Sequence, residues 1–147
     1  MDSFLVIALL IIGAGALVGF QIPLNSLLSS RVGLLEGALV VHLVGAVFAG
    51  MALLIFWTGG LSAWRTVTWY GYLGGVFGVT LITVLSFATP KIGVTATLVI
   101  FLVSQLIVGA IIGHFGWLET PIKPINFAKL IVFGLLIAGA WLVVKPS

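Results

Sequence analysis

FLVIALLIIGAGALVGF, the stretch of residues 4–20, decides the class of this protein, because it contains no polar side chain. A transmembrane β-strand would carry a lumen-facing polar residue at every second position, and residues 4–12 show no such alternation. An α-helix satisfies its backbone hydrogen bonds within one segment, as the hydrocarbon of a bilayer requires. The stretch therefore predicts a membrane-spanning helix.

The same pattern recurs along the chain, in which hydrophobic residues make up 62% of the 147 residues and charged residues only 6%. A soluble domain of this length needs far more charge to cover its surface. Crossing about 30 Å of hydrocarbon takes roughly 20 mostly apolar helical residues. Four charge-free windows exceed that length, and the fifth becomes long enough if Lys129 snorkels to the interface. The windows are residues 3–30, 37–64, 66–90, 92–118 and 130–144.

We therefore expect an all-α integral membrane protein, a bundle of five transmembrane helices that forms a single transmembrane domain over residues 1–147. The connections are short. The third helix should stop before Thr89 and Pro90, because proline interrupts the hydrogen bonds of a helix. The expected helices cover about residues 4–28, 35–57, 69–87, 94–115 and 127–144.

Several other protein classes are disfavoured by the same composition. Residues 3–30 are too long for the apolar core of a cleavable signal peptide and lack a basic leader. The absence of cysteine removes disulfides and thiolate metal sites, and we expect no metal and no cofactor. A net charge of +3 with dispersed basic residues argues against nucleic-acid binding. No nucleophile, base and orienting group stand together, which argues against an enzyme.

Polar side chains inside the predicted helices are the best indicators of function, because each costs free energy in lipid unless it is paired or hydrated. Gln21 and Asn25 are four residues apart and share one helix face. Pro23 between them frees the carbonyl of Gly19 and should kink the helix. A solute-binding surface is one interpretation of this face. A contact that joins two helices, or an interfacial helix end, is the other.

Ser104 and Gln105 lie near the middle of the fourth predicted helix, where the depth excludes an interfacial position. We therefore count them with Gln21 and Asn25 as candidate solute-binding residues, and we identify no catalytic residue. These groups are amides and hydroxyls, which favours a small neutral or weakly charged solute.

Three ionisable residues are weaker candidates. His42 stands alone in the second helix, as a hydrogen-bonded packing residue does, and His114 lies at a helix end, where an interfacial role is favoured. Glu36 opens the second helix and complements its dipole, with a proton-coupling site as the alternative. No predicted helix core contains Asp or Glu, which argues against proton-driven antiport of cations.

Small residues at helical spacing are densest in the third predicted helix, at Gly71, Gly74, Gly75 and Gly78. Membrane helices approach one another closely over such residues. This helix should therefore be crowded by its neighbours or should line a cavity.

GFQIPLNSLLSSRVG, residues 19–33, and the stretch from Ser104 to Gly116 together resemble the YdcZ-type family, short bacterial members of the drug/metabolite transporter superfamily. The resemblance covers nearly the whole chain. It implies a multi-pass protein of the bacterial inner membrane, similar to the small multidrug resistance proteins and to half of an EamA-type transporter. This chain departs from the family pattern at Gly113, where an acidic residue often precedes the histidine. It also lacks the glutamate that small multidrug resistance proteins carry in their first helix.

Two functions follow from these patterns. The first is a transporter that moves a small metabolite or drug-like solute by alternating access at the interface of an antiparallel homodimer of ten helices. The second is a non-transporting accessory or scaffolding membrane subunit. The basic residues favour dual insertion, because five spans divide them evenly between the two membrane faces. Arg65, Lys123 and Lys129 fall on the N-terminal side, and Arg31, Lys91 and Lys145 fall opposite.

Overall fold

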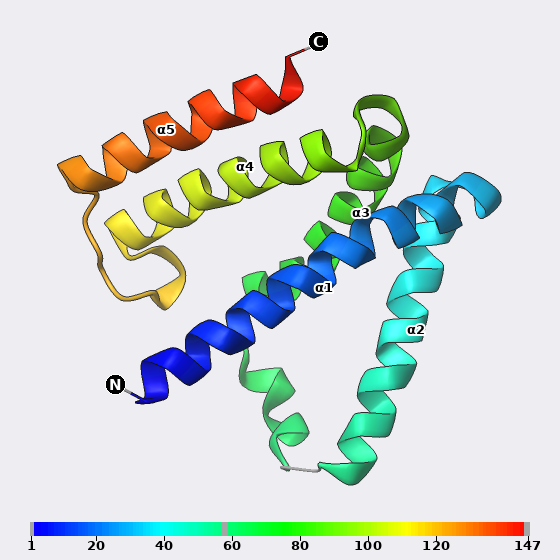
Figure 1. The fold of residues 1–147 in the computed structure, drawn as a ribbon. Coiled ribbons are helices and arrows are strands. Elements are labelled where there is room, and N and C mark those ends of the chain that lie inside the picture. Colours follow the sequence, from blue (N-terminus) through cyan, green and yellow to red (C-terminus); the bar gives the residue numbers. More distant parts are fainter. Residues whose placement is uncertain (1, 57–58, 146–147) are drawn as a thin grey trace. The chain divides into compact units, whose positions relative to one another are not determined.

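The computed structural model describes residues 2–56 and 59–145, and in this part of the chain the regular structure is helical, without a strand. Five helices are long and apolar enough to cross a membrane (Figure 1). The all-α fold with five membrane-spanning helices is thereby confirmed. The helices are α1 (Asp2–Val32), α2 (Leu34–Ile55), α3 (Leu73–Ile92), α4 (Val94–Phe115) and α5 (Phe127–Val144).

The helix bounds differ from the expected ones mainly at the ends of α1 and α3. Both helices run several residues further than expected, to Val32 and Ile92. Two 3-10 turns, η1 (Gly60–Thr66) and η2 (Trp69–Tyr72), precede α3, so its α-helical part begins later than expected. The second helix ends at Ile55, and its expected end at residue 57 lies outside the described residues. The bounds of α4 and α5 equal the expected ones.

The chain divides into two compact units, Met1–Pro90 and Lys91–Ser147. The first unit holds α1, α2, η1, η2 and nearly all of α3. The second holds α4, the short turn η3 (Trp117–Glu119) and α5. The single domain expected from the sequence stays a prediction.

One residue, Gly33, joins α1 to α2 in the first unit. Its backbone has φ 107° and ψ 158°, a region that is essentially restricted to glycine. Its N–H donates to the Ser29 carbonyl at 2.9 Å, and its own carbonyl accepts from the Gly37 N–H at 2.9 Å. A Cβ added at Gly37 would lie 2.5 Å from Ser29 Oγ, so the two helices touch directly above the turn. Glycine at both positions therefore permits this tight hairpin.

The turn between α3 and α4 has the same construction sixty residues later. Gly93 adopts φ 84° and ψ 158°. Its carbonyl accepts from the Thr97 N–H at 3.1 Å, as the Gly33 carbonyl accepts from Gly37. The preceding residues also correspond, since Arg31 and Val32 before one turn match Lys91 and Ile92 before the other. The chain thus repeats one helix–glycine–helix plan.

The repeat extends back along α1 and α3, both of which lie in the first unit up to Pro90. Three pairs of residues separated by sixty positions follow the same helical stripe. Ile22 and Ile82 are both buried, and so are Ser29 and Thr89. Between these two pairs lie Ser26 and Ser86, and they meet: the Ser26 hydroxyl donates to the Ser86 carbonyl at 3.5 Å. Matching positions of the repeat therefore face each other where α1 contacts α3.

Pro90 lies within the last turn of α3, so the expectation that this helix ends before Thr89 is wrong. Proline has no N–H and leaves the carbonyl four residues earlier without its helical donor. That carbonyl belongs to Ser86, and the Ser26 hydroxyl of α1 supplies a donor to it. A side chain from a neighbouring helix thus replaces the missing backbone hydrogen bond, and α3 continues to Ile92.

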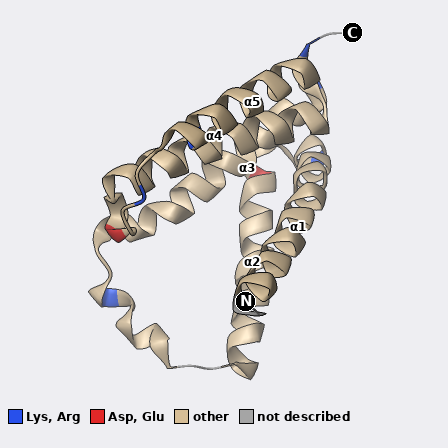
Figure 2. Ribbon diagram, turned by 60° about the vertical axis from the view of Figure 1, so that its left-hand side comes forward, with Lys and Arg blue, Asp and Glu red and all other residues tan. Residues whose placement is uncertain are grey.

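In the second unit α4 and α5 run antiparallel and side by side (Figures 1 and 2). The loop between them folds back on the end of α4, because the Lys123 N–H donates to the Gly113 carbonyl at 2.7 Å. The Ile125 N–H also donates to Nδ1 of His114 at 3.0 Å. Asn126 then caps α5 by accepting from the Lys129 N–H at 3.0 Å. His114 therefore anchors this loop at the helix end.

Charged residues of the described part of the chain lie at helix ends and in the connections (Figure 2). Arg31 and Lys91 stand in the last turns of α1 and α3, where a cation complements the helix dipole. Glu36 stands in the first turn of α2, where a carboxylate does the same.

The two glycine turns generate the first testable prediction. Gly33→Ala and Gly93→Ala each place a side chain on a backbone conformation that costs a non-glycine residue about 1–3 kcal/mol. We expect both variants to unfold at a lower temperature than the wild type, measured by circular dichroism in detergent. Gly45→Ala is the matched control, because nothing lies within 4 Å of its added methyl group. Its effect should be neutral or stabilising, as for alanine in a helix interior. A Gly93→Ala variant as stable as Gly45→Ala would contradict the prediction.

Candidate functional site

Gln21 and Asn25 lie one turn apart on α1, on either side of Pro23, and the helix runs through the proline without interruption. Gln21 is exposed and Asn25 is half-buried. Among the described residues neither carboxamide has a hydrogen-bond partner. The kink expected at Pro23 stays a prediction.

Ser104 and Gln105 are adjacent in α4, and both are exposed. The Ser104 hydroxyl donates to the carbonyl of Ile100 in its own helix at 2.9 Å, so its hydrogen is already used. The Gln105 carboxamide has no partner in the described part of the chain. Gln105 stands eleven residues after Val94, about 16 Å along the helix axis, which is the middle of a membrane-spanning helix.

These four residues form two separate groups in the structure. Gln21 and Asn25 belong to the first unit, and Ser104 and Gln105 to the second. The shared cavity expected from the sequence therefore stays a prediction. The exposed carboxamides are nevertheless informative, because an amide in hydrocarbon without a hydrogen-bond partner costs about 2–7 kcal/mol. Within their own units Gln21 and Gln105 are uncovered, and a second copy, a solute or water are chemical options for pairing them.

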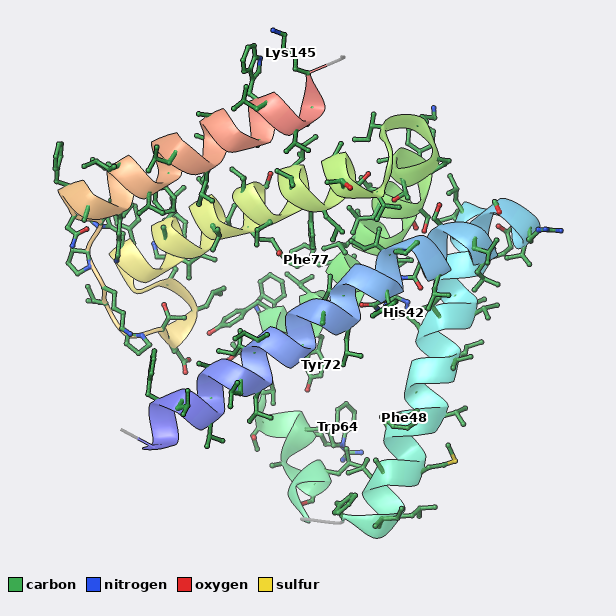
Figure 3. The ribbon with its side chains drawn as sticks, viewed as in Figure 1. His42, Phe48, Trp64, Tyr72, Phe77 and Lys145 are labelled. Carbon is green, nitrogen blue, oxygen red and sulfur yellow. The ribbon has the colours of Figure 1, made fainter. Side chains whose placement is uncertain are left out.

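His42 on α2 has features that the sequence did not reveal (Figure 3). Its Nδ1 lies 2.8 Å from the Ala38 carbonyl one turn earlier. The carbonyl only accepts, so Nδ1 carries the hydrogen and Nε2 of the neutral ring is left as an acceptor. A Cβ added at Gly78 of α3 would lie 2.9 Å from this Nε2. The ring therefore sits directly against the glycine backbone of α3.

The glycines of the third helix are not uniformly crowded. Gly78 is crowded by His42, and Gly71 by the side chain of Val67. Gly74 and Gly75 have no atom within 4 Å of an added Cβ, so at these two positions the single chain leaves open space. Close helix approach explains only part of the glycine stripe.

The 3-10 turns before α3 carry an aromatic cluster (Figure 3). The rings of Trp64 and Tyr72 pack edge to face with centroids 6.5 Å apart, and the Tyr72 hydroxyl donates to the Trp64 carbonyl. The Arg65 guanidinium lies 5.3 Å from the Trp64 ring. Aromatic rings beside a cation at a helix end are typical of the membrane interface. These contacts favour an interfacial anchor over a solute site.

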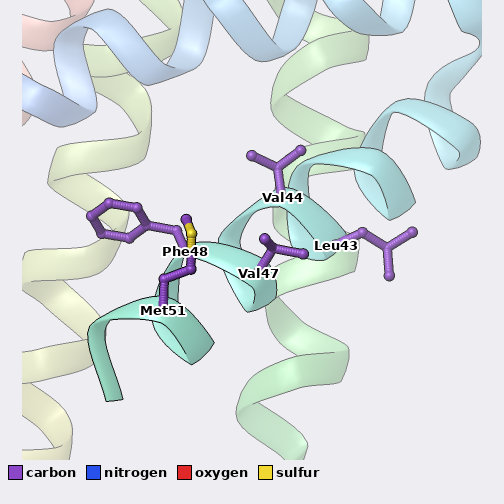
Figure 4. A pocket seen from close by; sticks show the side chains of 5 residues that line it. All are labelled: Leu43, Val44, Val47, Phe48 and Met51. Atoms are coloured by element: carbon purple, nitrogen blue, oxygen red, sulfur yellow. The ribbon is translucent and has the colours of Figure 1, made fainter. Parts of the chain in front are cut away.

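A shallow apolar groove runs along one side of α2 (Figure 4). Its five lining side chains are Leu43, Val44, Val47, Phe48 and Met51. It offers no polar side chain and cannot orient a polar solute. Among the described residues no group of three His, Cys, Asp or Glu side chains could hold a metal ion.

Comparison with known proteins agrees with the resemblance drawn from residues 19–33 and from the stretch beginning at Ser104. The family described as "Putative inner membrane exporter, YdcZ" matches residues 6–142. No curated protein and no solved structure matches the chain. The family match includes all four candidate site residues, and the five apolar helices agree with a multi-pass protein of the inner membrane. The chain belongs to the YdcZ family of inner membrane proteins.

Proposed function

We propose that the protein transports a small polar solute by alternating access, and that two antiparallel copies enclose a site lined by Gln21, Asn25, Ser104 and Gln105. The observation that carries the proposal is the exposure of Gln21 and Gln105 in the middle of apolar helices. An accessory subunit without cargo would have little use for unpaired amides at that depth. Membership in an exporter family supports transport rather than catalysis or scaffolding.

The exposed helix surfaces support assembly with a second copy. No residue of α5 is buried, and large apolar side chains are exposed along every helix. Lipid satisfies the apolar groups but not the carboxamides of Gln21 and Gln105. A two-fold axis in the membrane plane maps the middle of the bilayer onto itself. Residues at that depth in one copy can therefore meet those of an inverted copy, as in transporters built from inverted repeats.

The charge distribution supports an inverted pair. Short loops with more Lys and Arg remain on the cytoplasmic side, and here the two faces receive three basic residues each. Without a bias, both orientations insert, and a dimer of opposite orientations forms from one gene product. We also propose that the chain is a member of the drug/metabolite transporter superfamily, in which such antiparallel pairs are expected.

The chemistry of the four side chains indicates the solute. Carboxamides both donate and accept hydrogen bonds and carry no charge. The carboxylate of Glu36 stands in the first turn of α2, so it does not lie at the depth of the proposed site. A neutral or weakly charged solute with several hydrogen-bonding groups fits these side chains better than a cation does.

The site prediction is tested by substitution in proteoliposomes. The solute is first identified as the one that stabilises the wild-type protein saturably in a thermal-shift screen of small metabolites. Asn25→Ala and Gln105→Ala each remove about one hydrogen bond, worth about 1 kcal/mol. We expect each to lower solute affinity about fivefold. Val44→Ala, in the apolar groove of α2, is the control and should leave affinity unchanged. Unchanged uptake and binding in both site variants would refute the site.

The topology prediction uses the absence of native cysteine. Ser62→Cys places one thiol in the exposed turn η1 between α2 and α3. Intact cells are labelled with an impermeant thiol reagent before and after permeabilisation. We expect about half of the molecules to be protected in intact cells, since equal charge on both faces lets both orientations insert. Protection of all molecules or of none would exclude dual topology.

A further inference from the structure

We infer that His42 Nε2 is a further solute-binding group, a hydrogen-bond acceptor that selects solutes carrying an N–H or O–H donor. The inference rests on the proposed transport function and adds a residue to its site. Nδ1–H is bonded to the Ala38 carbonyl, which fixes the tautomer, and the remaining nitrogen is directed at α3.

The Nε2 atom has no donor to pair with in the described part of the chain. Its neighbour on α3 is Gly78, which offers only C–H groups at this contact. His42 is half-buried, and its Nε2 is not among the fully enclosed side-chain atoms without partners. Part of the His42 side chain is therefore accessible to groups outside the helix pair. In hydrocarbon an unpaired acceptor is costly, and a role in binding accounts for its presence at this depth.

The depth of His42 matches that of the proposed site. His42 stands eight residues after the start of α2 at Leu34, about 12 Å along the helix axis. Asn25 stands seven residues before the end of α1 at Val32, about 11 Å along its axis. Both distances are measured from the same turn at Gly33. The two polar groups therefore lie at about the same level of the α1–α2 hairpin, deep in about 30 Å of hydrocarbon.

The internal repeat gives independent support, because it separates shared positions from unique ones. The recurring pairs described above are structural: they form the turns and the contact of α1 with α3. The polar candidates do not recur. Gln21, Asn25 and His42 correspond to Leu81, Leu85 and Leu102, and Gln105 corresponds to Gly45.

His42 therefore belongs with the solute-binding candidates by this criterion as well. Glu36, which corresponds to Ala96, is also unique. Its place in the first turn of α2, where it complements the helix dipole, already accounts for it.

The described charged groups on α1, α2 and α3 stand at helix ends rather than beside His42. On α1 the described ionisable side chain is Arg31, and on α3 it is Lys91, each in the last turn of its helix. On α2 itself the other ionisable side chain is Glu36, in the first turn. Along all three helices these groups lie near the turns, away from the level of His42.

The first test needs no solute, because the chain has no cysteine. His42→Cys and Leu43→Cys are reacted in proteoliposomes with a negatively charged methanethiosulfonate, which enters water-filled space but not lipid. We expect His42→Cys to react at least tenfold faster than Leu43→Cys, whose side chain lines the apolar groove of α2. Equal, slow reaction of both thiols would show that position 42 is sealed, and would overturn the inference.

The second test separates the two ring nitrogens. In His42→Asn the amide can replace the Nδ1–H donor to Ala38, whereas in His42→Gln the longer side chain carries its oxygen towards the place of Nε2. We expect His42→Gln to retain solute binding in the thermal-shift assay and His42→Asn to lose it, with loss of at least fivefold in affinity. The reverse order would show that the ring has only a structural role.

A second pair of variants tests the same nitrogen from α3. Gly78→Ala sets a methyl group 2.9 Å from Nε2, while Gly75→Ala adds one in open space. Binding should weaken in the first and persist in the second.

If all solutes fail to bind the wild type while His42→Cys still reacts rapidly, the transport proposal fails and an aqueous path to position 42 stands. If solutes bind but all His42 and Gly78 variants bind equally well, the inference alone fails.

Discussion

A bilayer offers no hydrogen bonds, and this constraint accounts for most of the local structure of the chain. Each backbone group must find its partner within the protein, which is why the described segments that cross the membrane are helices. Hydroxyl side chains obey the same rule. Thr80, Thr83 and Ser104 each donate to the carbonyl four residues earlier in their own helix. Where Pro90 removes a backbone donor, Ser26 of a neighbouring helix supplies one.

The same constraint gives meaning to the few polar groups that remain unpaired. A hydroxyl can return its hydrogen to its own helix, but a carboxamide or an imidazole nitrogen cannot satisfy all its atoms in this way. Gln21, Gln105 and Nε2 of His42 are such groups. They lie on apolar helices, and within their own units they have no hydrogen-bond partner among the described residues. In a family of exporters, solute and a second subunit are the natural sources of these partners.

Hydropathy was sufficient to predict the number of helices and the bounds of α4 and α5, because an apolar stretch between charges has few alternatives in lipid. It failed at the ends of α1 and α3, where the limit is set by backbone conformation at Gly33 and Gly93 rather than by polarity. The predicted end of α3 before Pro90 was also wrong, because the local sequence does not show that a hydroxyl of another helix can replace the missing donor.

The candidate site was predictable in part. Polar residues at depth were recognised as Gln21, Asn25, Ser104 and Gln105, but the atom-level difference between the two nitrogens of His42 requires coordinates. One signal was present in the sequence and was missed. Arg-Val-Gly at residues 31–33 recurs as Lys-Ile-Gly at residues 91–93, and this recurrence alone indicates that the two hairpins share one plan.

The turn at Gly33 also has a mechanical consequence. Two successive peptide units separate the last residue of α1 from the first residue of α2, and these units span at most about 7 Å when fully extended. The end of α1 and the start of α2 therefore stay close together, and neither can shift past the other by a full helical turn. A displacement of the end of α1 is therefore transmitted to the start of α2. The segment between α2 and α3 is longer, so it does not impose this limit on the helix ends that it joins.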